Sequence, residues 1–170
     1  MAISPRLKAF LVKYKIKHKL QKHPVAYTAQ EIAAEEHVPG RQLAKCVLVT
    51  MDKGMALAVL PATQLVNLAK LKRVLKTKKA ALARESDVKR AFPDIEVGAM
   101  SVFGNLYDIP VVVDRTLAEA AEIVCNAGTH TDTVKLRYKD FEKFAKPKVG
   151  LFTASFATAQ KKKPKRRKAS

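Results

Sequence analysis

Tryptophan is absent from the 170-residue sequence, and aromatic residues make up only 6% of it. The hydrophobic fraction is 48%, so the core of a single globular domain must come mainly from Val, Leu, Ile and Ala. Long apolar runs are also absent, since 47–51 and 109–113 are far shorter than the ~20 residues of a membrane-spanning helix. Lysines interrupt the chain from Lys8 onward, which leaves no apolar signal-peptide region. These absences predict a cytoplasmic protein that does not enter a membrane.

Cysteine is scarce as well, with only Cys46 and Cys125. Both lie in apolar, strand-like runs, and the lack of an export signal gives no reason for a disulfide. A catalytic thiol, the alternative, would need a neighbouring base and an electropositive site. Lys45 precedes Cys46, but adjacent residues on a strand point to opposite faces. The pattern favours two buried thiols.

The common catalytic and metal-binding motifs are missing too. The sequence has no P-loop, no Gly-x-Gly-x-x-Gly after a strand, no Cys-x-x-Cys, no His-Glu-x-x-His and no Gly-x-Ser-x-Gly. The histidines lack the spacing of metal ligands; they are His18, His23, His37 and His130. We therefore expect neither a metal nor a cofactor.

Acidic residues are outnumbered, 15 against 33 basic residues, which gives a formal net charge of +18. Seven of the cations lie in the segment 161–168, and without them the remaining chain keeps a charge of +11. Such an excess attracts polyanions by releasing their counterions. A basic surface without a partner is the alternative, but the excess extends well beyond the C-terminal segment. Nucleic acid is therefore the favoured partner, although charge does not separate RNA from DNA.

Short helices and strands mingle along the chain without regular alternation. Ser4 and Pro5 suit a helix start, and Leu7, Phe10 and Leu11 then follow the spacing of a buried stripe. The further expected elements are strands at 25–27, 43–51, 55–60, 80–83, 110–114, 122–126 and 133–137, and helices at 28–36, 64–75, 86–92 and 138–145. This mixture predicts an α+β fold with a mixed, barrel-like sheet and flanking helices. We expect one domain over 1–150, followed by a disordered, basic low-complexity tail over 151–170.

Four segments carry a resemblance to a known family. They are 27–33 (YTAQEIA), 44–49 (AKCVLV), 98–107 (GAMSVFGNLY) continued by 109–114 (IPVVVD), and 126–130 (NAGTH). In this order the chain resembles the YbaK/prolyl-tRNA-synthetase-associated family of aminoacyl-tRNA editing deacylases, over about residues 20–145. The resemblance implies a mixed sheet or barrel-like core flanked by helices. It also implies hydrolysis of the ester that joins a mischarged amino acid to the 3′ end of tRNA, without a metal or a covalent intermediate.

The resemblance assigns roles to individual residues. Lys45 matches the family lysine, and its ammonium group suits the phosphate of the terminal adenosine. Gly98 matches the first glycine of the second motif, but Val102 replaces the proline that follows it in the family, a change that puts the shape of this loop in question. The implied catalytic residues are Lys45, Gly98 and His130. The implied substrate-binding residues are Tyr27, Thr28, Ser101, Val102, Phe103, Gly104, Gly128 and Thr129.

Each assignment has a plainer alternative, such as an ordinary surface lysine at Lys45, a turn histidine at His130 and a helix cap at Thr28. The leading hypothesis is a trans-editing deacylase acting on tRNA-Pro that carries a small residue such as Ala or Cys, selected by pocket volume. Its partners would be tRNA and an aminoacyl-tRNA synthetase. The alternatives are a non-catalytic RNA-binding protein of the same fold and a DNA-associated basic protein.

Overall fold

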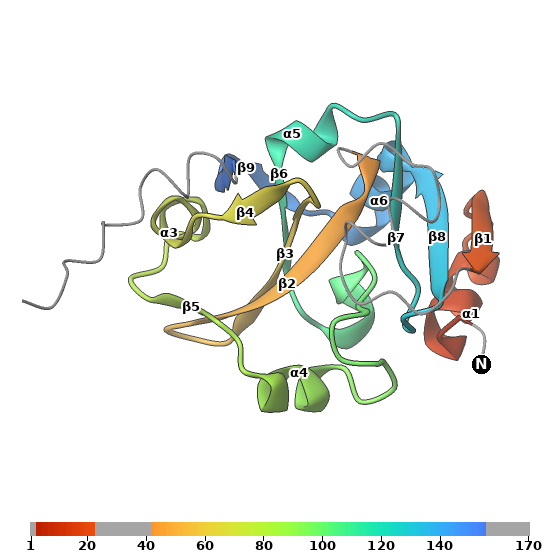
Figure 1. Cartoon of the computed structure of the whole chain (residues 1–170), viewed down its shortest axis with the longest axis horizontal. Coiled ribbons are helices and arrows are strands. Elements are labelled where there is room, and N and C mark those ends of the chain that lie inside the picture. Colours follow the sequence, from red (N-terminus) through yellow and green to blue (C-terminus); the bar gives the residue numbers. More distant parts are fainter. Residues whose placement is uncertain (1–2, 23–41, 156–170) are drawn as a thin grey trace, which may run out of the picture.

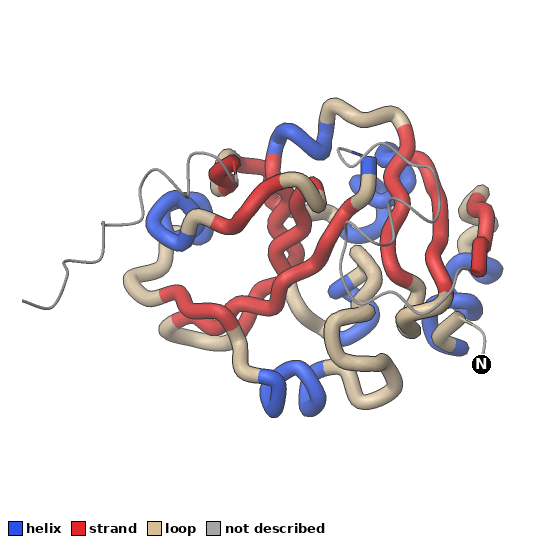
Figure 2. Tube along the Cα trace, viewed as in Figure 1, coloured by secondary structure: helices blue, strands red, loops and turns tan. Residues whose placement is uncertain are grey.

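The computed structural model describes residues 3–22 and 42–155. Several predicted features lie outside these ranges, namely the strand 25–27, the helix 28–36, the basic segment 161–168, Tyr27 and Thr28. Within the described ranges, helices and strands are mixed along the chain as the sequence predicts (Figures 1 and 2). No helix in these two ranges is long and apolar enough to span a bilayer.

All of the helices are short. They are α1 (Pro5–Lys13), α3 (Leu68–Leu75), α4 (Glu85–Ala91), α5 (Arg115–Ala118), α6 (Tyr138–Ala145) and the 3-10 helix η2 (Gly104–Tyr107). The strands are β1 (His18–Lys22), β2 (Ala44–Met51), β3 (Met55–Pro61), β4 (Gln64–Val66), β5 (Ala80–Leu82), β6 (Val111–Asp114), β7 (Glu122–Asn126), β8 (Asp132–Arg137), β9 (Lys148–Gly150) and β10 (Thr153–Ser155).

The strands form three sheets, with the orders β5-β2-β3-β6-β9, β1-β8-β7 and β10-β4. Two pairs, β3 with β6 and β6 with β9, are parallel, and the other ladders are antiparallel. This confirms the predicted α+β class with a mixed sheet. Among the described strands no sheet closes on itself, so the sheets are open rather than a closed barrel.

The two larger sheets meet at the start of β2. Leu43 precedes β2 and forms a parallel bridge with Val124 of β7. Further along the same edge of β2, β5 pairs from Val49 onward. Between these two pairing partners, Cys46 Sγ donates to the carbonyl oxygen of Ser101 at 3.4 Å. This bond ties the loop that contains Ser101 to the face of β2 that packs in the main cluster.

Side chains of β2 alternate between two hydrophobic clusters. Ala44, Cys46 and Leu48 face the main cluster, which also contains residues of α1 and α6. Val47 and Val49 face a smaller cluster on the other side of the sheet, which α3 covers. The alternation is that of a strand with both faces packed.

The prediction of one helix over 64–75 was wrong in its first part. Gln64–Val66 is β4, in which Leu65 pairs with Ala154 of β10. Asn67 then caps α3, since its Oδ1 accepts from the N–H of Lys70 at 3.0 Å. Pairing with a strand almost ninety positions away overrides the local helical spacing of the leucines, and the cap sets the true start of the helix.

The fold also continues past residue 150, where the sequence predicted the start of the tail. Phe152 is completely buried, and its N–H donates to Asp114 Oδ1 at 2.8 Å. β10 follows directly and pairs with β4. Residues 151–155 therefore belong to the folded unit. A single buried phenylalanine in a weakly polar stretch does not reveal this from composition.

Candidate functional site

Lys45 and Asn126 share one face of the joined sheets. Leu43 and Val124 are bridge partners, so their side chains lie on the same side of the sheet. Lys45 and Asn126 are two residues further along β2 and β7, and residues two apart on a strand share a face. Cys46 points the opposite way, into the main core. The sheet thus carries a half-buried lysine and an asparagine side chain on the face away from that core.

Asn126 joins this face to Gly98, because its Nδ2 donates to the Gly98 carbonyl oxygen at 3.4 Å. Backbone bonds hold the same loop: the Gly128 N–H donates to Ala99 O, and the Glu96 N–H donates to Gly128 O, both at 3.0 Å. Gly98 has φ +87°, which residues with a Cβ rarely adopt, so the turn itself requires glycine. These contacts place the Gly98 turn against the end of β7.

His130 lies beside the same turn. Its backbone N–H donates to Glu96 Oε1 at 2.9 Å, and its ring Nε2 is 2.8 Å from the carbonyl oxygen of Val97. A carbonyl oxygen only accepts hydrogen bonds, so Nε2 carries the hydrogen. A Cβ on Gly98 would lie 3.6 Å from the ring Cε1. The His130 ring therefore lies beside the Gly98 turn, with Nε2 engaged in holding the loop.

Three predicted segments, around Lys45, Gly98 and His130, are thus brought together from distant parts of the chain. The sequence profile of the aminoacyl-tRNA editing domain matches residues 23–144, a range that contains all three. The chain belongs to this family. No protein of curated function matches its sequence.

Solved structures share the fold of this editing domain. A candidate trans-editing enzyme for prolyl tRNA synthetase superimposes with a TM-score of 0.77 at 17% identity, covering 91% of this chain and 100% of that one. The hypothetical protein APE2540 gives a TM-score of 0.80 at 18% identity, covering 88% and 99%. A scaffold protein from epitope backbone grafting gives 0.79 at 19% identity, covering 90% and 97%. At these identities the matches establish the architecture of the editing domain in this chain.

The rest of the editing-domain loop is buried. Ser101, Val102 and Phe103 are at most 5% exposed, and Val102 and Phe103 pack in the main cluster. Ser101 Oγ accepts from the Phe103 N–H at 3.3 Å. A Cβ on Gly104 would approach Ile109 O to 2.9 Å, so close packing excludes a larger residue there. The side chains of Ser101, Val102 and Phe103 are therefore packed within the fold, and Gly98 is the exposed position of this segment.

The two cysteines of this editing domain differ in burial, since Cys125 is buried and Cys46 is half-buried against the main cluster. Burial raises the pKa of Cys125 to about 12, while a backbone hydrogen bond from Val102 acts in the opposite direction. Burial, followed by the neighbouring Cys125, raises the pKa of Cys46 well above its ordinary value. Reactive cysteines instead have lowered pKa values. The prediction of a buried thiol is confirmed for Cys125 and holds only in part for Cys46.

Lys45 has the electrostatic character of an anion-binding group. Burial lowers the pKa of its ammonium group below the ordinary lysine value. A partly desolvated ammonium gains more from a phosphate than a fully hydrated one, because less water has to be displaced. A lysine that is only half exposed on a sheet face therefore suits a bound anion better than one on an open surface.

Asn126 is a residue of the site that the sequence analysis did not select. Its Nδ2 is used on Gly98, whereas its Oδ1 is buried and has no hydrogen-bond partner within the described part of the chain. A buried acceptor of this kind is costly unless a ligand supplies the donor. The available signal was its place in the NAGTH segment, as a polar residue ending an apolar strand.

The turn that contains Gly128 and Thr129 borders a cavity that Lys45, Gly98 and His130 do not line. Gly128 has φ +101°, and a Cβ there would lie 2.7 Å from Ser4 Cβ, so the start of α1 packs directly on this glycine. Thr129 is buried, and its hydroxyl donates to Asp132 Oδ2. A cavity of about 530 Å³ lies beside this turn, lined by Ser4, Pro93, Asp94, Ile95, Glu96, Gly128, Thr129 and Thr131.

Proposed function

We propose that the chain hydrolyses the ester bond of mischarged aminoacyl-tRNA, acting in trans on tRNA-Pro that carries a small residue such as Ala or Cys. The observation that supports this most is the placement of Lys45 and Asn126 on one sheet face, with Asn126 bonded to Gly98. An aminoacylated RNA terminus needs a cation for its phosphate, a hydrogen-bond acceptor and backbone groups. Lys45, Asn126 Oδ1 and the Gly98 turn offer these groups. Membership of the editing-domain family supports the same reading.

In this proposal the residues have distinct roles. The Lys45 ammonium binds the phosphate of the terminal adenosine. Asn126 Oδ1 accepts a hydrogen bond from the ribose hydroxyl or the α-ammonium group of the substrate. The Gly98 turn presents backbone groups to the aminoacyl carbonyl, as in other sites that stabilise a developing oxyanion. His130 is a positioning residue, because its Nε2–H is committed to Val97 O.

The chemical step needs only water and positioning. The water oxygen bonds to the ester carbonyl carbon, the bond from that carbon to the ribose oxygen breaks, and one water proton ends on the ribose oxygen. The neighbouring ribose hydroxyl of the tRNA can relay that proton. An aminoacyl ester is already activated, so holding the reactants in register contributes most of the acceleration.

The replacement of the family proline by Val102 is compatible with activity. Val102 is completely buried, and the preceding carbonyl of Ser101 accepts the Cys46 thiol hydrogen bond. Core packing and this bond restrain the loop where proline would have restricted its backbone.

The test is a release assay with purified protein and a panel of mischarged tRNAs, including Ala-tRNA-Pro and Cys-tRNA-Pro. We expect release from a subset of the panel and its loss in Lys45→Ala, with uncharged tRNA binding measured in parallel. Lys45→Arg is the matched control, because it keeps the charge. An inactive wild-type protein that still binds tRNA with a steep salt slope would instead support the second candidate, a non-catalytic RNA-binding protein, which the Val102 departure and the net charge of +18 favour.

A further inference from the structure

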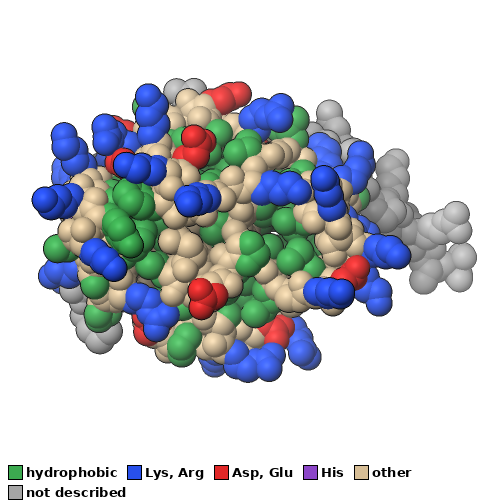
Figure 3. Space-filling model, turned by 180° about the vertical axis from the view of Figure 1, so that it is seen from behind, with side chains coloured by type: hydrophobic (Ala, Val, Ile, Leu, Met, Phe, Trp, Pro, Cys, Tyr) green, Lys and Arg blue, Asp and Glu red, His purple; other side chains and the backbone are tan. Residues whose placement is uncertain are grey.

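Cationic residues surround the molecule, so net charge alone does not locate bound RNA. Figure 3 shows Lys and Arg side chains around the whole outline of one face, with few acidic ones between them. Only cations with a defined position relative to Lys45 can indicate where the RNA lies. The strand pairing of the three-stranded sheet defines that position for several lysines.

β1, the outermost strand of this sheet among the described residues, carries a lysine on the same face as Lys45. Within the ladders, Lys19 of β1 lies opposite Lys135 of β8, and Lys135 lies opposite Val124 of β7. Val124 in turn is the bridge partner of Leu43. Residues directly opposite one another project to the same face. Lys45 is two residues beyond Leu43 and shares its face. Lys19 and Lys135 therefore lie on the face that carries Lys45.

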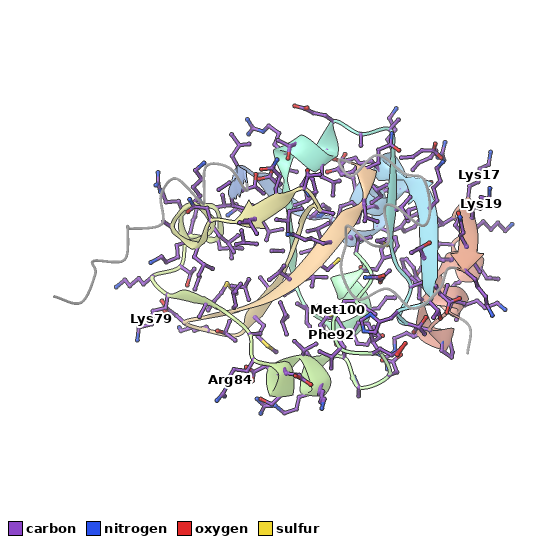
Figure 4. The ribbon with its side chains drawn as sticks, viewed as in Figure 1. Lys17, Lys19, Lys79, Arg84, Phe92 and Met100 are labelled. Atoms are coloured by element: carbon purple, nitrogen blue, oxygen red, sulfur yellow. The ribbon has the colours of Figure 1, made fainter. Side chains whose placement is uncertain are left out.

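Lys17 lies just before β1, two positions from Lys19. Both side chains are exposed, and Figure 4 places them together at the outer end of β1. None of the ion pairs formed among the described residues includes Lys17 or Lys19. Lys135 has an exposed pair with Glu122 at 3.6 Å, which is worth little in water.

The pairing of Lys19 with Lys135 opposes folding, since like charges directly across a ladder repel. A lysine on an edge strand can serve to prevent pairing with other sheets, but that purpose does not require a second lysine opposite it. The described segment 3–22 contains six lysines, one arginine and no acidic residue to relieve the repulsion. A bound polyanion would remove this unfavourable term.

The distance from this edge to Lys45 fits an RNA end. β8 and β7 separate β1 from β2. Neighbouring strands are about 4.8 Å apart, so the β1 lysines are about 14 Å from the strand of Lys45. An RNA whose 3′ terminus is held at Lys45 would reach this edge within a few nucleotides.

We propose that Lys17, Lys19 and Lys135, the β1 edge, bind backbone phosphates of the tRNA acceptor arm while its 3′ terminus lies at Lys45. This proposal rests on the proposed function, because it takes the RNA terminus to be the group bound there. The lysines of the β1 edge do not touch the ester. They act on binding and on the alignment of the arm.

The experiment compares Lys17→Gln/Lys19→Gln with a control of equal charge change, Lys78→Gln/Lys79→Gln. Lys78 and Lys79 are also exposed, and Figure 4 shows Lys79 at the opposite end of the molecule. Affinity for uncharged tRNA is measured on the full chain at several salt concentrations. Losing two phosphate contacts should reduce the slope of log K against log salt by about 1.4–1.8. The control should change it by less than half as much, and thermal unfolding should confirm that both variants fold.

A deacylation assay distinguishes failure of the β1-edge proposal from failure of the proposed function. If the wild-type protein releases an amino acid, the β1-edge variant should raise KM severalfold and leave kcat unchanged. Equal salt slopes for the variant and the control would overturn the β1-edge proposal without touching the proposed function. A wild-type protein inactive on every tRNA would sink the proposed function, and the binding comparison with uncharged tRNA would still decide whether RNA lies on this edge.

Discussion

The ring Nε2 of His130 lies 2.8 Å from the carbonyl oxygen of Val97, the residue immediately before the left-handed Gly98. The histidine is thus bonded to the backbone of the turn that is expected to face the ester. This geometry assigns it to holding the turn in place. The bond engages Nε2 alone, so in the neutral ring Nδ1 is the nitrogen without a hydrogen.

Replacing His130 with Ala should lower kcat/KM about tenfold, the loss expected from one hydrogen bond that positions the turn. His130→Gln, which can still donate to Val97 O, should recover part of the activity. Denaturant unfolding of the three proteins separates this effect from a loss of stability. A stably folded His130→Ala variant as active as wild type would contradict the positioning role.

Alanine substitutions at the two glycines should separate activity from stability. In Gly98→Ala the new Cβ makes only an ordinary contact with His130, so the loss of unfolding free energy comes from the left-handed backbone and is about 1–2 kcal/mol. We expect this variant to lose more in kcat than in stability. Gly128→Ala also forces a Cβ to 2.7 Å from Ser4 Cβ and should cost about 3 kcal/mol. Denaturant unfolding and release assays on both variants measure the two effects. Equal stability of the two variants would contradict the close packing of α1.

The lowered pKa of Lys45 predicts an early alkaline decline in substrate binding. Because burial favours the neutral amine, Lys45 loses its proton at a lower pH than an exposed lysine does. The phosphate then loses its counter-charge, so KM should rise with pH on the alkaline side. Lys45→Arg stays charged throughout and should remove that rise. Release rates between pH 7 and 10, corrected for uncatalysed hydrolysis, test this, and identical profiles for both proteins would refute it.

Truncations should locate the C-terminal boundary of the fold. Removing everything after residue 155 should leave thermal stability close to that of the full chain. Removing the segment after 160 should weaken tRNA binding without changing kcat on saturating substrate.

Phe152→Ala should lower the free energy of unfolding by about 3–5 kcal/mol, because a fully buried ring is lost. Thermal melts and tRNA binding measure these outcomes. A variant Phe152→Ala as stable as wild type would mean that 151–155 does not contribute to the core.

Much of the local structure was predictable from residues close in the chain. The hairpin of β2 and β3 follows from two apolar runs around Asp52-Lys53-Gly54, and α6 begins after β8 as the periodicity indicates. β1 was not predicted, since its lysines lack the alternation of a half-buried strand, and only pairing with β8 makes it one. β4 was misread as helix for the same reason, because its partner β10 lies far along the chain.

The candidate site was likewise predictable only in part from the sequence. Motif order and spacing were sufficient to select Lys45, Gly98 and His130, and composition was sufficient to expect a polyanionic partner. Asn126 could not be selected, since an unpaired Oδ1 is a property of its surroundings in space. The burial of Ser101, Val102 and Phe103 could not be predicted either, because it depends on packing against residues that are distant in the sequence.

By itself, the order of residues determined the class of fold, the family and the basic character of this protein, because these depend on periodicity, motif spacing and charge count. Tertiary structure alone decided which groups act together. Strand pairing places Lys45, Asn126, Lys19 and Lys135 on one face, and a hydrogen bond joins the Gly98 turn to Asn126, 28 positions away. Such contacts are set by packing and hydrogen bonding across the whole fold, which no local pattern encodes.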